Sequence, residues 1–287
     1  MSDVKESRRT LLQELKSDLT PTIVIALGVL VSLIVVVIFA PYIAPHSEAE
    51  ILTDDSFSFA TDTMLLGSDF LGRDILSRLL YGLRVTLLLA LAISILSFIL
   101  GALLGFVAAV LQGKTDMILS RVMDALISFP SLIIALIVVS SLGSSFTVLI
   151  ITVALIDSTR VFRVARAVAM DVVVQDYIEA AKVRGEKLGW IVYGEMLPNT
   201  LGPLMAEFGI RFTYAILFIS TLSFLGLGVQ PPHSDLGLMI KENVQGLLYG
   251  SFAPLYSAIC IAAVTISVNT CVDWLMKSTS ASLPEEL

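Results

Sequence analysis

Runs of about 20 apolar residues constrain the fold of this chain more than any other feature. Residues 22–40, "TIVIALGVLVSLIVVVIFA", carry no charged side chain. A helix needs about 20 such residues to cross the hydrocarbon core of a bilayer. With 56% hydrophobic residues, 15% charged residues and a mean hydropathy of +0.90, the chain has more apolar surface than a soluble domain can hide. The sequence therefore predicts an all-α, polytopic membrane protein.

The hydropathy pattern predicts six transmembrane helices. Their approximate ranges are 21–40, 84–111, 118–140, 146–168, 200–228 and 252–276. The first apolar run resembles a signal peptide, but its 19 residues exceed the usual core of about 7–15 residues. Ala40 before Pro41 is also a poor cleavage context. We therefore expect a retained membrane anchor.

The distribution of lysine and arginine predicts the orientation. With the amino terminus inside, 13 of the 18 basic residues fall in cytosolic segments, 4 fall in outer segments, and Arg211 lies within a span. Positive residues accumulate on the cytosolic side of membrane proteins. Both termini are therefore expected in the cytosol.

Three segments outside the spans have a distinct character. The cytosolic tail 1–20 is either a short surface helix or disordered, and 277–287 is a second cytosolic tail. The outer loop 41–83 ends in "GSDFLGRDILSRLLYG", where Asp69–Arg73 and Asp74–Arg78 are acid-before-base pairs four residues apart. That order favours a helix. The loop is therefore expected to contain an amphipathic helix before the core of the protein, residues 84–276.

A charged cytosolic loop, 169–199, interrupts the apolar chain with "YIEAAKVRGEKLGWIVYGEMLPN". Val173, Tyr177 and Ala181 form one stripe of a predicted amphipathic helix. Gly185 suits the end of that helix, and Pro198 is expected to break the following turns and start the next crossing. On these grounds the loop either docks onto a soluble partner or simply connects two spans.

This loop resembles the EAA loop of ABC-importer permeases. The matching residues are Glu179, Ala180, Ala181, Gly185, Leu197 and Pro198. Glu195 departs from the pattern, because an apolar residue is usual there. The resemblance implies that residues 179–185 form the coupling helix that docks onto an ATPase. The residues it assigns to this coupling role are Glu179, Ala180, Ala181, Arg184, Gly185, Leu197 and Pro198.

Further stretches resemble the second permease of dipeptide and oligopeptide importers. They are residues 66–88, 123–136 and 222–232. The resemblance implies a MetI-like bundle of six helices in a bacterial or archaeal inner membrane, with both termini inside. It implies a paralogous permease, two cytosolic ATPase subunits and an extracytoplasmic solute-binding protein as partners. Peptides are the expected solute, and nickel, opines and oligosaccharides remain alternatives.

Four ionisable residues in the predicted spans are candidates for the pathway or its gate. They are Asp124, Asp157, Glu207 and Arg211. Charges inside a membrane are costly and often mark a pathway. Local neutralisation is the simpler interpretation, because Glu207–Arg211, Asp157–Arg160 and Arg121–Asp124 have helical pair spacing.

The sequence predicts no cofactor or catalytic site on this chain. It has no GxxxxGK[ST] phosphate loop, so ATP and Mg²⁺ are expected on the ATPase partners. His46 and His233 are isolated from other ligand types, and Cys260 and Cys271 lie about 16 Å apart on one predicted helix. No metal site, disulfide or nucleic-acid partner is expected. An ion-coupled carrier is the rival interpretation, but the two halves show no clear internal repeat. A membrane enzyme is a weaker rival, because HExxH and GxSxG motifs are absent.

Overall fold

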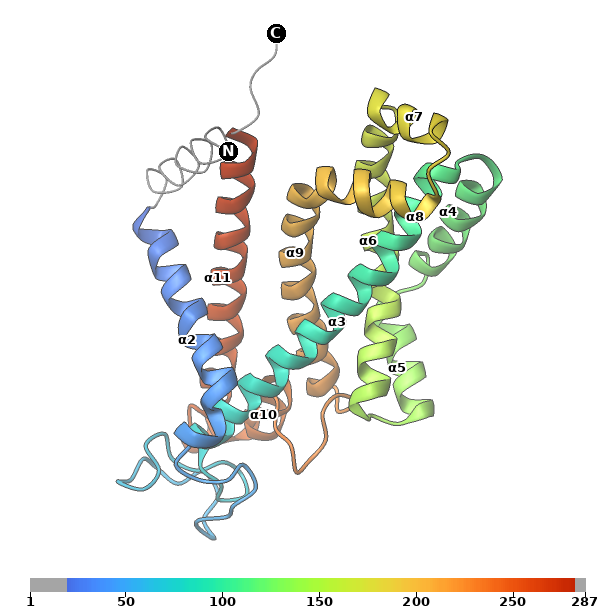
Figure 1. Cartoon of the computed structure of the whole chain (residues 1–287). Helices are drawn as coiled ribbons and strands as arrows, with labels where there is room; N and C mark the ends of the chain where they lie inside the picture. Colours follow the sequence, from blue (N-terminus) through green and yellow to red (C-terminus); the bar gives the residue numbers. More distant parts are fainter. Residues whose placement is uncertain (1–19, 282–287) are drawn as a thin grey trace.

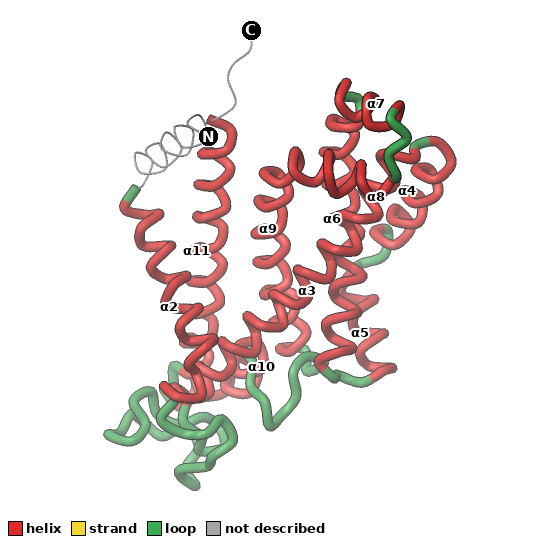
Figure 2. The backbone as a smooth tube through the Cα atoms, in the orientation of Figure 1, coloured by secondary structure: helices red, strands yellow, loops and turns green. Residues whose placement is uncertain are grey.

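The computed structural model describes residues 20–281, with side chains up to Lys277. The amino-terminal tail, apart from residue 20, and the end of the carboxy-terminal tail lie outside the described residues. The described chain is helical, with two isolated β-bridges and no strand (Figure 2). This confirms the predicted all-α class.

Long helices account for most of the fold. Their bounds are α2 (Pro21–Ile43), α3 (Ile75–Leu111), α6 (Phe146–Val173), α9 (Leu197–Phe224) and α11 (Ala253–Ala281). Shorter elements join them: α4 (Gly113–Ile127), α5 (Ser131–Leu142), α7 (Asp176–Val183), α8 (Leu188–Trp190), the π-helix η1 (Ile191–Met196), α10 (Leu236–Asn243) and the 3₁₀-helix η2 (Val244–Tyr249).

Four helical segments among the described residues are long and apolar enough to cross a membrane: 21–43, 75–111, 188–224 and 253–277. The pair α4 and α5 adds a fifth if it forms one broken span. The helix α6 is outside this set, and it carries Asp157, Arg160, Arg163 and Arg166. The total of six crossings therefore stays a prediction.

The chain bends at Pro130, inside the expected third crossing. The helices α4 and α5 meet at an angle of 81° across the break before Ser131. Proline lacks the N–H group that would continue the helix and restricts the residue before it. The expected crossing at 118–140 is therefore two helices.

The helix α3 differs from the expected arrangement. It runs unbroken from Ile75 to Leu111, so a separate amphipathic helix in the outer loop and a boundary at 83/84 are both wrong. The helix begins where Asp74 accepts a hydrogen bond from the backbone N–H of Ser77. An aspartate in this position satisfies an otherwise unpaired donor at a helix start.

The predicted boundaries of the last two crossings lie closer to the observed helix ends. The helix α9 ends at Phe224, before "LGLG", instead of reaching residue 228. Gly226 and Gly228 therefore lie after the end of the helix. The helix α11 holds Cys260 and Cys271, as expected, and both are free thiols.

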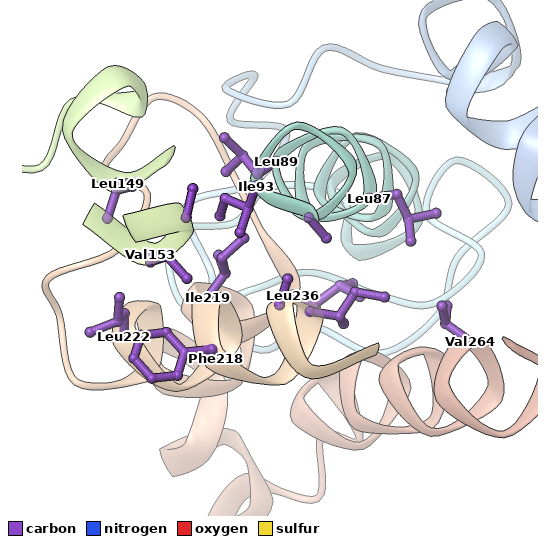
Figure 3. Close-up of a cluster of buried hydrophobic side chains, with 14 of the residues drawn as sticks. Leu87, Leu89, Ile93, Leu149, Val153, Phe218, Ile219, Leu222, Leu236 and Val264 are labelled. Carbon is purple, nitrogen blue, oxygen red and sulfur yellow. The ribbon is translucent and has the colours of Figure 1, made fainter. Parts of the chain in front are cut away.

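The main hydrophobic core lies around α3. Side chains from α3, α6, α9, α10 and α11 meet there, as Figure 3 shows for ten labelled residues. Gly101 and Gly105 let α3 approach α6 closely, since a Cβ at Gly101 would lie 2.5 Å from the backbone oxygen of Ser158. Small residues four apart permit such packing between membrane helices.

The fold has two distinct ends. Figure 1 shows the beginning of α2, the end of α11 and the short helix α7 at one end, which we call the α7 side. The loop 44–74 and α10 lie at the opposite end, the loop side. The described parts of the two tails and the charged loop therefore share one side, as the predicted topology requires.

Candidate functional site

The helix α7 is held against the protein by one apolar edge. Ile178 and Ala181 are fully buried and pack with Ala165 and Ala169 of α6 and Met196 of η1. The rest of the helix is solvent-exposed, including Glu179, Ala180 and Lys182. Residues three apart share a helix face. The helix is therefore anchored along one side and displays the other.

The predicted stripe on this helix is partly wrong. Val173 and Ala181 are buried, but Tyr177 is exposed, and Val174 is 74% exposed. The reason is a break at residues 174–175 between α6 and α7, which changes the direction of the following side chains. A single helical period cannot be extended across such a break.

A glycine corner ends α7, as predicted. Gly185 has a φ of 77°, and its N–H donates to Lys182 O at 3.0 Å. The N–H of Glu186 donates to Ala181 O at 3.2 Å. This pair of hydrogen bonds is a Schellman motif, which needs a left-handed residue at the position of Gly185. The direction of the chain after α7 therefore depends on glycine.

The second half of the loop packs despite the unusual Glu195. Met196, the next residue, is fully buried with Ile191 and Val192. Glu195 turns toward Arg184, with 3.6 Å between carboxylate and guanidinium. Burial, followed by the charge of Glu195, raises the pKa of Tyr177. The two halves of the loop are thus in contact.

Pro198 lies in the first turn of α9, as expected for the start of that helix, but it does not break the helical turns before it. Residues 188–224 are continuously helical, with a π-helical segment directly before Leu197 and Pro198. Proline cannot donate the ordinary α-helical hydrogen bond. A π-helical segment changes the hydrogen-bond spacing locally, so proline is accommodated there. Figure 1 shows α8 lying crosswise to α9.

The exposed side of this region combines apolar and charged groups. Val183 is 83% exposed, and Trp190 and Tyr193 are also largely exposed. Lys182, Arg184 and Lys187 supply positive charge. We call these exposed residues, with Glu179, the α7 surface. Exposed apolar side chains rimmed by charge are typical of surfaces that bind another protein.

Three of the four candidate pathway charges meet between α6 and α9. Arg211 lies 2.7 Å from Glu207 and 3.4 Å from Asp157. Arg160 lies 3.8 Å from the same Asp157 oxygen. Two acids and two bases therefore form a cluster with balanced formal charge, in which the Asp157 side chain is buried and that of Arg160 is 36% exposed. The predicted Glu207–Arg211 pair is confirmed, and the second acid comes from a different helix.

Asp124 does not join this cluster. Its carboxylate accepts a hydrogen bond from Arg163 at 2.7 Å, and both side chains are about half exposed. The predicted partner Arg121 is not the one observed. Nearby, Arg166 makes a two-pronged ion pair with Asp116. These pairs connect α4 to α6.

Sequence reasoning missed a buried ion network on the loop side. Arg73 and Arg78 each pair with two acids, Asp69 and Glu242 of α10. Arg78 bridges both acids, with 2.9 Å to Glu242, and its side chain is 1% exposed. The predicted Asp69–Arg73 pair is confirmed, although it lies in a turn. The predicted Asp74–Arg78 pair is wrong, because Asp74 caps α3.

The loop side contains a second missed carboxyl group, Asp235. It is buried and accepts hydrogen bonds from the N–H groups of Gly237 and Leu238 at the start of α10. Burial raises the pKa of Asp235 to about 6, although these donors oppose the shift. Nearby, His233 Nδ1 lies 3.0 Å from a carboxylate oxygen of Glu48. The expectation that this histidine is isolated from acidic side chains is therefore wrong.

This pKa predicts a measurable pH dependence. Between about pH 4 and 6 the folded chain keeps a proton that the unfolded chain releases, so the stabilising contribution is lost as pH rises through 6. The shift from 3.8 corresponds to about 3 kcal/mol. We expect the thermal midpoint of the detergent-solubilised wild-type protein to rise as the pH is lowered from 7.5 to 5. In Asp235→Asn this rise should be smaller, because the titrating group is gone. The exposed Asp62→Asn variant is the control, and parallel curves for wild type and Asp235→Asn would contradict this pH dependence.

The described residues contain no cluster of three or more potential metal-binding side chains from histidine, cysteine, aspartate or glutamate.

Comparison with known proteins identifies the family of this chain. Residues 101–282 match the family model described as "Binding-protein-dependent transport system inner membrane component".

Individual relatives extend the match beyond that segment. The chain is 34% identical over 268 residues to "Dipeptide transport system permease protein DppC" of Escherichia coli K12, covering 91% of this chain and 89% of the relative. It is 35% identical to "Di/tripeptide transport system permease protein DppC" of Pseudomonas aeruginosa, over 76% and 75% of the two chains. A solved amino acid ABC transporter aligns with a TM-score of 0.46 and 19% identity, covering 68% of this chain and 91% of that chain.

Proposed function

Because the chain belongs to the family of binding-protein-dependent transport system inner membrane components, we propose that it forms part of the pathway of an ATP-driven peptide importer. The substrate class rests on relatives named as dipeptide and di/tripeptide permeases. Nickel, opines and oligosaccharides are the alternatives within the same transporter class. The pathway would be shared with a paralogous permease, and a binding protein would deliver solute from outside.

The observation that carries the proposal is the α7 surface. A short helix with a rigid glycine end presents apolar and charged side chains while its other edge is anchored in the core. Such a helix can sit in a groove of a soluble partner. We propose that the partner is an ATPase subunit and that ATP and Mg²⁺ bind there. Displacement of α7 would reach α6 and α9 through the buried contacts of Ile178 and Met196.

The cluster of Asp157, Glu207, Arg160 and Arg211 is proposed as an inner gate. Its members come from α6 and α9. These helices meet the apolar contacts of α7 and η1 at the α7 side. Ion pairs inside a membrane are sensitive to small separations, because few alternative partners exist there. Movement of α7 relative to α9 would therefore alter the gate. Asp124, which pairs elsewhere, is not included.

Co-purification tests the proposal. In mild detergent the tagged chain should bring down ATPase subunits together with a second permease. An ion-coupled carrier would be recovered without an ATPase, and that result would contradict the proposal.

Glu179→Lys is the variant expected to weaken this association. Glu179 is exposed in the first turn of α7, where a negative charge is favoured by the helix dipole. Reversal costs the isolated chain about 1 kcal/mol or less, so insertion should persist. Peptide uptake and recovery of ATPase should fall about tenfold. The lysine would face a partner surface that is complementary to a negative charge, and the two like charges would repel each other.

Asp54→Lys makes the same charge change at an exposed position of the loop side. It should recover ATPase at the wild-type level. Equal recovery and uptake for Glu179→Lys and wild type would remove Glu179 from the docking surface.

A further inference from the structure

A large apolar cavity lies beside the proposed gate. Its volume is about 560 Å³, and α3, α4, α5 and α6 line it. One side of the cavity is formed by α4 and α5, which meet at an angle of 81°. Pockets for small ligands usually measure about 300–1,000 Å³. The space therefore suits a molecule the size of a short peptide.

The cavity wall contains one charged residue, Arg160. Ser158 and Thr159 also line the cavity, but their hydroxyls donate to backbone oxygens of Leu155 and Ile156 in their own helix. Their hydrogen-bonding capacity is thus partly used within α6. Among the lining residues, Arg160 alone offers a positive charge to a ligand.

Arg160 is poorly paired within the described part of the chain. Its Nη1 is buried and has no hydrogen-bond partner there. The nearest carboxylate oxygen, on Asp157, is 3.8 Å away and also lies 3.4 Å from Arg211. A buried N–H group without a hydrogen-bonded acceptor is costly. An incoming carboxylate would supply an acceptor to the guanidinium.

Tyr214 holds this guanidinium in place. The ring centre of Tyr214 lies 4.5 Å from Arg160 Cζ, a cation–π arrangement. The tyrosine hydroxyl in turn lies 3.4 Å from Ser131 Oγ, at the start of α5. Arg160 side-chain exposure is 36%, so part of the group remains reachable. The guanidinium is therefore positioned without being enclosed.

We infer that Arg160 and the adjoining apolar cavity form a binding site for the terminal carboxylate of a short peptide with apolar side chains. Arginine can bind a carboxylate through two parallel N–H groups. The apolar walls would accept aliphatic or aromatic side chains. This inference rests on the proposed function, because it takes the translocated solute to be a peptide.

The direct test is equilibrium binding to the complete transporter. The assembled complex, in lipid nanodiscs and without its binding protein, is incubated with tritiated trileucine or with trileucine amide. Wild type should bind the free acid about tenfold more tightly than the amide, because hydrogen bonds between charged groups carry that much free energy. Arg160→Gln should remove this difference, because it weakens the binding of the free acid and leaves the binding of the amide unchanged. Equal binding of acid and amide to wild type, or binding of neither, would overturn the inference.

Two further variants separate this site from general damage. Arg163→Gln removes an arginine one turn along α6 that pairs with Asp124 outside the cavity, and it should keep the preference for the acid. Arg160→Lys keeps the charge but loses the paired geometry, so its preference should fall between wild type and Arg160→Gln. An unchanged preference in both Arg160 variants would overturn the inference.

An anionic phospholipid is the competing occupant of the cavity. If Arg160→Gln loses a tightly held anionic phospholipid in mass spectrometry while peptide preference is unchanged, the cavity binds lipid and the inference is wrong. ATP-dependent uptake of trileucine by wild-type proteoliposomes with the binding protein tests the proposed function separately. Uptake without Arg160-dependent binding overturns this inference alone. Absence of uptake overturns the proposed peptide transport.

Discussion

Arg78→Met should lower the thermal midpoint of the detergent-purified protein by on the order of 10 °C. Arg78 is fully buried between Asp69 and Glu242. Removal of one member of a buried ion network leaves an uncompensated charge and costs about 3–5 kcal/mol, and each kcal/mol shifts the midpoint by about 2–4 °C for a domain of this size. Methionine occupies much of the volume of the arginine stem, so the loss is mainly electrostatic.

Two controls isolate that cause. Arg84→Met removes an arginine from the same helix that makes no ion pair with any described residue, and it should change the midpoint little. The double variant Arg78→Met/Glu242→Gln leaves Arg73 paired with Asp69 at 2.7 Å and restores charge balance. It should regain part of the lost stability. A double variant no more stable than Arg78→Met would show that packing, not charge balance, dominates.

Gly185→Val should uncouple ATP hydrolysis from transport while leaving the chain in the membrane. Gly185 holds a φ of 77°, which a β-branched residue adopts at a cost of about 1–3 kcal/mol. A Cβ there would meet no atom within 4 Å, so the penalty comes from the backbone alone. If release of α7 from its docked orientation relieves the strain, docking falls roughly 5- to 150-fold. Solute-stimulated ATP turnover in the assembled complex measures the effect.

Gly189→Val provides the matched control four residues later. A Cβ at Gly189 also meets no atom within 4 Å, and its φ lies outside the left-handed range. The same side chain is therefore added without backbone strain, and coupling should stay near wild type. Normal coupling in Gly185→Val would show that the corner does not set the orientation of α7.

Local features of this fold were predictable because single residues decide them. The positive φ of Gly185 follows from the glycine after a short helical pattern. The break before α5 follows from Pro130, since proline cannot continue a helix. The uninterrupted apolar run of α2 identifies a helix long enough to span a membrane. Each prediction needed only the properties of a short segment.

Features that depend on helix register were less predictable. Asp74 and Arg78 have the spacing of an ion pair, but the helix begins after Asp74, and its carboxylate caps the backbone instead. Likewise, the stripe through Tyr177 assumed an unbroken period, whereas the chain breaks before α7. A shift of one or two residues in a boundary exchanges the buried and exposed faces.

Long-range charge partners were beyond reach of spacing rules. Arg78 meets Glu242, 164 residues away, and Arg211 meets Asp157, 54 residues away. Local spacing identified Glu207–Arg211 and Asp69–Arg73, since both are four residues apart. Which second acid completes each group depends on how the helices pack. The poorly paired Arg160, on which the inferred carboxylate site rests, emerges only from that packing.

The central claim is that the α7 surface faces the cytosol and is covered by an ATPase subunit. Its most direct test places one cysteine at Val183, which is largely exposed, after Cys260 and Cys271 are replaced by alanine. In intact cells an impermeant maleimide should not label Val183→Cys, and in isolated membranes a bifunctional cross-linker should join this cysteine to an ATPase subunit. Labelling from outside, or no cross-link in a complex that transports peptide, would contradict the claim.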